Sequence, residues 1–338
     1  MKRVALKIAY IGTNFHGFQR QPNHRTVEGE IIYVLKNLGY IDDLEKSKFR
    51  IAGRTDRGVH SLGNVVSFMS EREVIINQIN HKLPQDIQII AKAPVRYGFK
   101  PRYSMSKHYR YIFFEKNMNI QAMKDVARIF IGEHDFTNFS KKDQKTPVRK
   151  IDNIKITPED STTSSYEYSQ KSEDNPYSLA SSKYDTDLKD SGEFLKTNYL
   201  GELKAIGRFN KNFNNIKFNN DSYDSIYIDV YGESFLWNMI RKMARVFLWV
   251  GKNELEVEKV KDMLNPNKKY NIKPLNPENL ILMDIEYDNI KFQYDDYAFE
   301  GFKRTLLENL FDYKLKLSIE NSILNSMESL KNKDFNRK

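Results

Sequence analysis

Short runs of alternating apolar and polar residues, interleaved with stretches of helical periodicity, restrict this chain to folds that mix strands with helices. Residues 3–10 alternate with a period of two, which is typical of a strand. Residues 26–38 instead place apolar side chains on one helical face, with Thr26 positioned to cap the helix and Gly39 to end it. The pattern of strands interleaved with amphipathic helices recurs to about residue 287.

The other expected elements follow the same two periodicities. Strands are predicted at 49–52, 63–69, 87–97, 108–115, 151–157, 226–231 and 280–287. Helices are predicted at 73–83, 120–131 and 254–264. Ser234 is positioned to cap one further, long helix, which Gly251 closes.

Residues 158–225 interrupt this pattern. They are rich in Ser, Asp, Asn, Tyr and Lys, a composition that buries too little apolar surface to offset the entropy of ordering. We therefore expect a long, mobile insertion between the strands at 151–157 and 226–231, which would otherwise be hairpin partners. Its net charge of -4 has the wrong sign for binding phosphate, which favours a spacer.

The domain organisation expected from these boundaries has three parts. They are an N-terminal half, 1–104, with a candidate catalytic loop at 53–60; a C-terminal half, 105–287, that carries the insertion; and a C-terminal extension, 288–338. The extension mixes aromatic and charged residues, and we expect it to be partly helical and to lie outside the main sheet.

Charge and composition limit the class of function. The formal net charge is +9, and residues 1–157 carry 28 Lys and Arg against 15 Asp and Glu. This surplus favours a phosphate-rich partner such as nucleic acid, although a lysine-rich composition also serves solubility alone. The chain has no cysteine, which excludes disulfides and thiolate metal sites. With no long apolar span and no leader pattern, a soluble cytoplasmic protein without membrane contact is expected.

The loop that is most informative about chemistry holds one carboxylate between two arginines. Asp56 lies between Arg54 and Arg57, and Gly53 and Gly58 flank this segment. Glycines permit backbone conformations that other residues avoid, so the loop can present Asp56 at a surface. Nearby cations favour the ionised carboxylate, which is the form a nucleophile requires. The alternative is an ordinary surface turn in which Asp56 pairs with Arg54 or Arg57.

This loop does not stand alone. Its run Gly53-Arg54-Thr55-Asp56-x-Gly58-Val59-His60 resembles the signature of the TruA family of pseudouridine synthases. Further runs similar to that family's motifs follow in order: Phe15 to Gln21, Leu83-Pro84-x-Asp86-Ile87, Phe99 to Ser104, Lys107 to Tyr111, Gly132 to Phe139, Thr146-Pro147-x-Arg149 and Phe235 to Arg241. The resemblance extends from about residue 6 to residue 285, apart from the insertion.

The resemblance implies a fold and an activity. The expected fold is α+β, with two ferredoxin-like halves that share a central antiparallel sheet, helices packed on one face and the active cleft between the halves. The expected activity is isomerisation of uridine to pseudouridine at positions 38–40 in the anticodon stem-loop of tRNA. The family also implies a homodimer, and the reaction requires no cofactor and no metal.

Carried over by position, the resemblance assigns roles to individual residues. Asp56 is the catalytic residue, Arg241 pairs with it, and Tyr109 contacts the target base. On the residues alone, Tyr109 is equally an ordinary strand aromatic and Arg241 a surface cation with a buried stem. Leu280 is expected to pack the pocket, although Asn279 precedes it where the family usually has glycine; a positive φ there would suit asparagine.

Other cations are candidates for binding the RNA backbone. They are Arg20, Arg54, Arg57, Arg102, Lys107 and Arg110, each of which could equally be solvated surface. Extrusion of the target nucleotide costs a few kcal/mol, which such contacts would offset.

Two rival functions remain open. One is an RNA-binding protein that kept the fold but lost the chemistry; intact Asp56, Tyr109 and Arg241 argue against it. The other is a metal-dependent nuclease or deaminase that uses His60, His134 and Asp135. These residues lack the spacing of known zinc motifs, which disfavours it.

Overall fold

The structure is a computed structural model that describes residues 1–140, 146–159 and 224–335. The predicted insertion therefore lies almost entirely outside the described residues. The strands are β1 (Lys2–Tyr10), β2 (Arg50–Ile51), β3 (His60–Ser70), β4 (Ile87–Pro94), β5 (Ser106–Glu115), β6 (Gly132–Asp135), β7 (Val148–Ile151), β8 (Asn153–Pro158), β9 (Asp224–Gly232), β10 (Leu280–Glu286) and β11 (Gln293–Tyr294). The helices are α1 (Val27–Asn37), α2 (Ile76–Asn80), α3 (Ile120–Phe130), α5 (Met239–Gly251), α6 (Lys259–Met263) and α7 (Asp296–Phe335).

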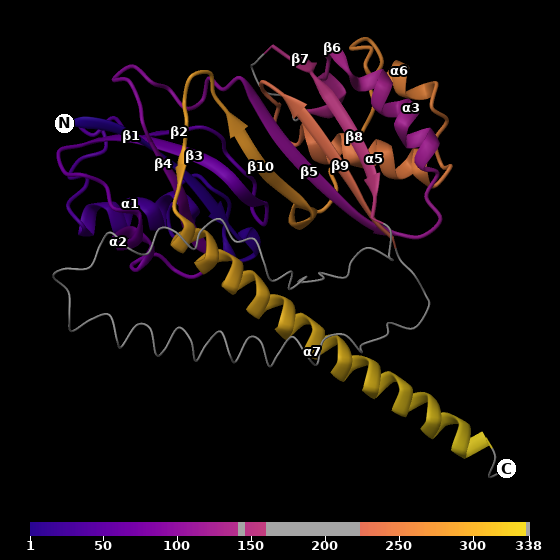
Figure 1. Ribbon diagram of the computed structural model, residues 1–338. Helices are drawn as coiled ribbons and strands as arrows, with labels where there is room; N and C mark the ends of the chain where they lie inside the picture. Colours follow the sequence, from indigo (N-terminus) through magenta and orange to yellow (C-terminus); the bar gives the residue numbers. More distant parts are fainter. Residues whose placement is uncertain (141–145, 160–223, 336–338) are drawn as a thin grey trace, which may run out of the picture. The chain divides into compact units, whose positions relative to one another are not determined.

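One nine-stranded sheet runs through the described residues (Figure 1). Its order is β11-β4-β1-β3-β10-β5-β9-β8, and β2 pairs with β3 beside this path. Strand β10 pairs in parallel with β3 and antiparallel with β5, so it joins the strands of the two predicted halves. The α+β class and the mostly antiparallel sheet are confirmed, whereas the division into two ferredoxin-like halves stays a prediction.

The predicted hairpin across the insertion is present. Strands β8 and β9 pair antiparallel from Asn153 opposite Tyr231 to Pro158 opposite Ile226. The isoleucine and valine side chains of both strands are buried and alternate with less buried ones, except at Asp229 of β9, which is buried on the other face. The chain therefore leaves the sheet after β8 and returns to the same pairing at β9.

Helices α1, α2, α3 and α5 cover one face of the sheet. Leu6 and Ile8 of β1 pack with α1 and α2, whereas Tyr109 and Tyr111 of β5 pack with α3 and α5. These two clusters share a face, because Leu282 of β10 stands opposite both Tyr109 of β5 and Ser61 of β3, and Ser61 stands opposite Tyr10. The expectation of helices on one face therefore holds for these four helices but not for α7, whose Phe302 packs against the other face.

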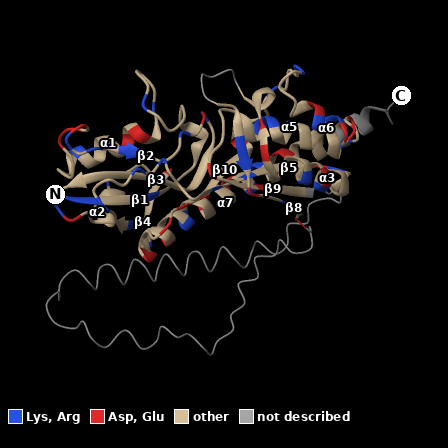
Figure 2. Ribbon diagram, turned by 90° about the horizontal axis from the view of Figure 1, so that it is seen from above, with Lys and Arg blue, Asp and Glu red and all other residues tan. Residues whose placement is uncertain are grey.

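The extension departs from its prediction at its start. Strand β11 pairs with β4 and so belongs to the main sheet. Helix α7 then begins at this edge, where Phe302 packs against Ala9 and Ile90, which face away from α1 (Figure 2). The expectation that residues after 288 lie outside the sheet is therefore wrong for Gln293 and Tyr294. The start of α7 also contributes to the core, since Ala298 and Phe302 are buried. None of the described helices is a candidate for a membrane span.

Three local predictions need correction. Helices α2 and α6 are five residues each, shorter than the 73–83 and 254–264 expected. Ser234 does not cap a helix, since α5 begins five residues later, at Met239. Asn238, directly before it, has a φ of 65°, a left-handed conformation that a helix interior does not accept.

Candidate active site

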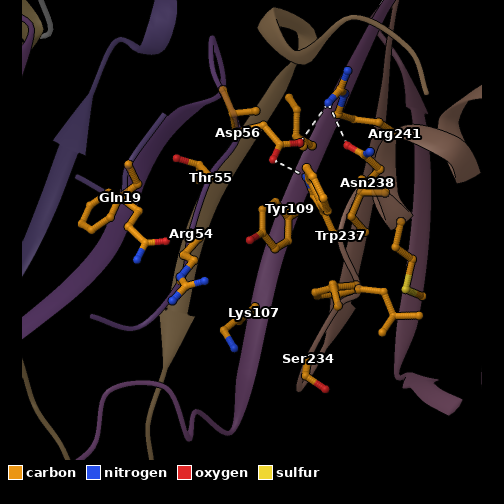
Figure 3. Close-up of a pocket in the computed structure, with 18 of the residues that line it drawn as sticks. Gln19, Arg54, Thr55, Asp56, Lys107, Tyr109, Ser234, Trp237, Asn238 and Arg241 are labelled. Carbon is orange, nitrogen blue, oxygen red and sulfur yellow. Dashed lines mark hydrogen bonds and ion pairs between the residues drawn. The ribbon is translucent and has the colours of Figure 1, made fainter. Parts of the chain in front are cut away.

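Asp56 lies in the loop between β2 and β3, and both of its carboxylate oxygens accept hydrogen bonds (Figure 3). Arg241 donates from Nη1 to Oδ2 at 2.9 Å, and Trp237 donates from Nε1 to Oδ1 at 2.8 Å. The expected alternative, a surface turn in which Asp56 pairs with Arg54 or Arg57, is not what the structure contains. The cation that pairs with the carboxylate comes instead from α5, 185 residues further along the chain.

The loop is held in place by the segment that follows β1. Phe18 donates its backbone N–H to the carbonyl of Thr55 at 3.1 Å, and the Thr55 hydroxyl lies 2.8 Å from the buried Tyr10 hydroxyl. Gly17 has a φ of 90°, and a Cβ there would come within 2.8 Å of the Thr55 carbonyl oxygen. A side chain at Gly17 would therefore push the loop away, which explains the glycine of the Phe15 to Gln21 motif.

Arg241 lies in the first turn of α5, and three acceptors fix its guanidinium. Besides Asp56, its Nε donates to the Leu275 carbonyl at 2.7 Å and its Nη1 donates to Oδ1 of Asn238 at 3.0 Å. Its side chain is only 14% exposed. Arg241 is therefore not a surface cation with a buried stem, and its guanidinium orients the Asp56 carboxylate.

Tyr109 lies on β5 beside this pair, and its ring is almost fully buried. The ring meets Phe235 edge-on at a centroid distance of 5.3 Å. Burial raises the pKa of the Tyr109 phenol above its ordinary value, and Tyr10 and Asp56 raise it further. The phenol therefore keeps its proton, which makes Tyr109 a poor general base and leaves it an apolar surface with a hydroxyl donor.

A cleft of about 2020 Å³ surrounds these residues. Among the residues predicted to bind substrate, Arg54, Arg57, Arg102, Tyr109 and Leu280 line it, as does Lys107. Arg54 points away from Asp56, along the cleft (Figure 3). The lining comes from both the 1–104 and the 105–287 portions of the chain.

Two of the predicted cations lie elsewhere. Arg20 is not among the described residues that line the cleft; its side chain is half exposed, and its Nε lies 3.8 Å from Glu28. Arg110 points to the opposite face of the sheet, where its Nε donates to Asp229 at 2.8 Å. Successive residues of a strand face opposite ways, so Arg110 cannot share the cleft with Tyr109.

Asn279 stabilises the turn before β10 through its side chain and not through a left-handed backbone conformation. It closes the 3-10 helix η3 (Pro277–Asn279) and does not have the positive φ that the sequence suggested. Its side-chain Nδ2 instead donates to the Ile112 carbonyl of β5 at 2.8 Å. The asparagine thus adds a bond that glycine lacks, and the following Leu280 is buried at the cleft.

The residues of the metal-dependent rival have other partners. Nδ1 of His60 accepts the backbone N–H of Gly12 at 3.1 Å, and its Nε2 lies 3.0 Å from the Glu278 carbonyl. Burial lowers the pKa of His60, which fits the neutral ring that these two bonds require. Nε2 of His134 lies 3.0 Å from the carbonyl of Ile131. Within the described ranges, no three His, Asp or Glu residues are grouped to hold a metal ion.

Trp237 is a candidate site residue to which the sequence assigned no role. It belongs to the run Phe235 to Arg241 that carried the resemblance, but an indole gives no signal of its own in that run. Its bond to Asp56 depends on the left-handed Asn238, which turns the chain just before α5. Arg149, quoted in another motif without a role, also lines the cleft.

Comparisons with known proteins agree with this geometry. A family model described as tRNA pseudouridine synthase matches residues 7–104 and 126–288. The tRNA pseudouridine synthase A of Methanobrevibacter smithii is 51% identical over 333 residues, covering 98% of this chain and 99% of the relative. The protein of that name from Methanothermobacter thermautotrophicus is 40% identical, with 93% and 92% covered. The one from Pyrococcus furiosus is 32% identical, with 96% and 99% covered.

Proposed function

This chain belongs to the tRNA pseudouridine synthase family, and we propose that it isomerises uridine to pseudouridine in tRNA with Asp56 as its catalytic residue. The observation that carries the proposal is the carboxylate of Asp56, held at 2.9 Å by Arg241 at the wall of a large cleft. The names of the relatives supply the reaction and the substrate class.

The reaction balances without a redox partner. The bond between N1 and C1′ breaks, the uracil turns, and a bond forms between C5 and C1′. The proton at C5 leaves to solvent and N1 gains one. Asp56 serves either by adding to C6 of the ring or by assisting departure of the base; both routes need its carboxylate, which Arg241 holds at 2.9 Å.

The surrounding residues have roles that follow from their positions. Arg241 orients Asp56, and Tyr109 lies against the detached ring, with Leu280 packing the pocket behind it. Arg54, Arg57 and Arg102 bind the RNA strand that enters the cleft. Arg20 lies outside this lining, and we assign it to a more distant part of the RNA.

The test is release of tritium from C5-labelled uridine in tRNA transcripts, comparing wild type with Asp56→Asn. The amide has the size of the carboxylate and its oxygen still accepts from one of the two donors, Arg241 or Trp237, while the charge and the second acceptor are lost. We expect release by the wild type, none by the variant, and equal tRNA affinity in both. Tight binding by both proteins with no release from any transcript would instead support the non-catalytic RNA-binding rival.

We also propose the finer details that the family resemblance implies. The target uridines lie at positions 38–40 of the anticodon stem-loop, and transcripts with a single uridine at one of these positions would each release tritium. The protein acts in the cytoplasm as a homodimer in which one tRNA touches both subunits. A mass of one chain by light scattering, with full activity, would contradict the dimer.

A further inference from the structure

Three cationic side chains line the cleft near one another, and one of them, Arg102, acts electrostatically on the other two. They are Arg102, which precedes β5, Lys107 on β5, and Arg149 on β7. Lys107 points into the cleft beside Ser234 (Figure 3). The proposed chemistry at Asp56 uses none of the three.

Lys107 has a long, flexible side chain, but burial and a hydrogen bond fix its position. The whole residue is 8% exposed, and its Nζ donates to the backbone carbonyl of Glu233 at 3.2 Å. The Ser104 hydroxyl donates to the same carbonyl at 3.4 Å. One of the three N–H donors of Lys107 is thus used by the protein, and the ammonium is held at the cleft wall with others to offer.

Arg149 is fixed in a similar way. Its Nη1 donates to the carbonyls of Thr146 and Val148, both at 2.6 Å. Its Nε is buried and has no hydrogen-bond partner among the residues that the structure describes. A buried donor without a partner costs free energy, so an acceptor at this place would be bound favourably.

The charges of the cluster are only partly compensated, by the carboxylate of Glu233, which also lines the cleft. Among the described residues, none of the three cations forms an ion pair with a carboxylate. Burial lowers the pKa of Lys107 to about 8, with Arg102 lowering it and Glu233 opposing. Burial and then Arg102 also lower the pKa of Arg149. Cations that repel one another in a partly dry site favour a bound anion.

The distance to Tyr109 suggests which anion. Lys107 and Tyr109 face the cleft from the same strand, two residues apart, which is about 6.8 Å along a strand. This spacing is of the order of the distance between a base and the phosphates on its own ribose. A strand of RNA with one base against Tyr109 therefore brings a flanking phosphate to Lys107.

We propose that Arg102, Lys107 and Arg149 form one binding site for a backbone phosphodiester that flanks the target uridine. The inference rests on the proposed function, because Tyr109 defines where the target base lies. The site fixes the register of the strand in the cleft, so that one nucleotide reaches Asp56.

The experiment combines Lys107→Ala with RNA in which a neutral methylphosphonate replaces either the 5′ or the 3′ phosphate of the target uridine. For the wild type, we expect the replacement at one of the two positions to weaken the Kd by about tenfold, the size of a charge-assisted hydrogen bond. Lys107→Ala should lose about the same affinity for natural RNA and lose nothing further with that methylphosphonate. The other methylphosphonate should affect both proteins equally.

Lys124→Ala is the matched control, since Lys124 is exposed on α3 and outside the cleft. It should bind all three RNAs as the wild type does. Should Lys107→Ala fail to fold, the exposed Arg102 permits the same cycle with Arg102→Gln. The proposal would be overturned if both methylphosphonates weakened the Kd of Lys107→Ala as much as that of the wild type. It would also be overturned if Lys107→Ala lost no more affinity for natural RNA than Lys124→Ala does. Binding alone decides this, whereas tritium release decides the proposed function.

Discussion

The two faces of strand β5 carry cations in opposite circumstances. On the face away from the cleft, Asp229 is 4% exposed and accepts from His108 at 2.6 Å and from Arg110 at 2.8 and 3.0 Å. On the cleft face, Lys107 is equally buried, but its protein partner is a backbone carbonyl. One face is an internally neutralised network and the other is an open positive site.

This difference separates two reasons for burying a charge. Asp229 with its two partners is complete without a ligand, so it serves the joining of β5 and β9. The ammonium of Lys107 forms one hydrogen bond with the protein, which offsets little of the free-energy cost of its desolvation. A bound anion would offset the rest. Residues one position apart in the sequence can therefore have unrelated roles, which substitutions should distinguish.

The largest effect is expected in the cleft, at the residue that orients Asp56. Arg241→Lys keeps the charge but loses the bonds to Leu275 and Asn238, so the carboxylate is no longer aimed. We expect the rate of tritium release at saturating tRNA to fall about 100-fold, as for a small misplacement of a reacting group. Stability and tRNA affinity should change little. An equal loss in affinity would mean that Arg241 binds RNA directly.

On the opposite face, Asp229→Asn should affect stability instead of activity. It leaves two partners without their anion, and we expect a loss of about 2–3 kcal/mol in the free energy of unfolding. Although burial opposes ionisation, hydrogen bonds from His108 and Arg110 hold the pKa of Asp229 below its ordinary value.

Because the pKa of Asp229 is lowered, Asp229→Asn should also change how the free energy of unfolding depends on pH. The stability from Asp229 is present above its unfolded pKa of about 3.9 and is lost as the pH falls through the lower, folded value. Urea unfolding between pH 6 and pH 3 should therefore show a shallower acid loss in Asp229→Asn than in the wild type. Identical slopes would show that the network contributes no net stabilisation.

A third, smaller effect concerns the pH dependence of RNA binding. With a pKa of about 8, which burial and Arg102 lower and Glu233 raises, Lys107 loses its proton between pH 7 and pH 9. Because the charged form binds phosphate, the Kd of the wild type should rise by up to about tenfold over this range. Lys107→Arg should flatten the profile in fluorescence anisotropy titrations, and an unchanged profile would exclude Lys107 as its cause.

The smallest effect is expected from Trp237→Phe. This change removes one donor to Asp56, and since the tryptophan is 52% exposed, we expect only about a fivefold loss in single-turnover rate. Trp249→Phe is the matched control, since the only other tryptophan packs against the core and does not line the cleft. If both variants behaved alike, the bond to Asp56 would have no part in the reaction.

Much of the fold follows from local pattern. Alternation in 3–10 and capping by Thr26 predicted β1 and α1 almost to the residue, because both depend on neighbours in the chain. The start of α5 could not be predicted in this way. Ser234 is a good cap by residue type, but the left-handed Asn238 sets the helix start. The entry of β11 into the sheet depends on distant β4 and has no local signal.

The candidate site divides in the same way. Asp56 and Arg241 were paired through resemblance, since nothing local links residues 185 positions apart. Arg110 was grouped with the cleft cations because its charge was visible, but which face it occupies is set by the register of β5 and by Asp229 on β9. Trp237 and the unpaired Nε of Arg149 became visible only with the backbone in place.

The hairpin of β8 and β9 has a consequence for the integrity of the enzyme. Residues 159–223 connect its two strands, and six residue pairs between β8 and β9 hold the strands side by side. A chain cut between β8 and β9 would put Asp56 on one fragment and Arg241 on the other. Catalysis would then become a reporter of fragment reassembly, and the polypeptide a natural candidate for a split enzyme.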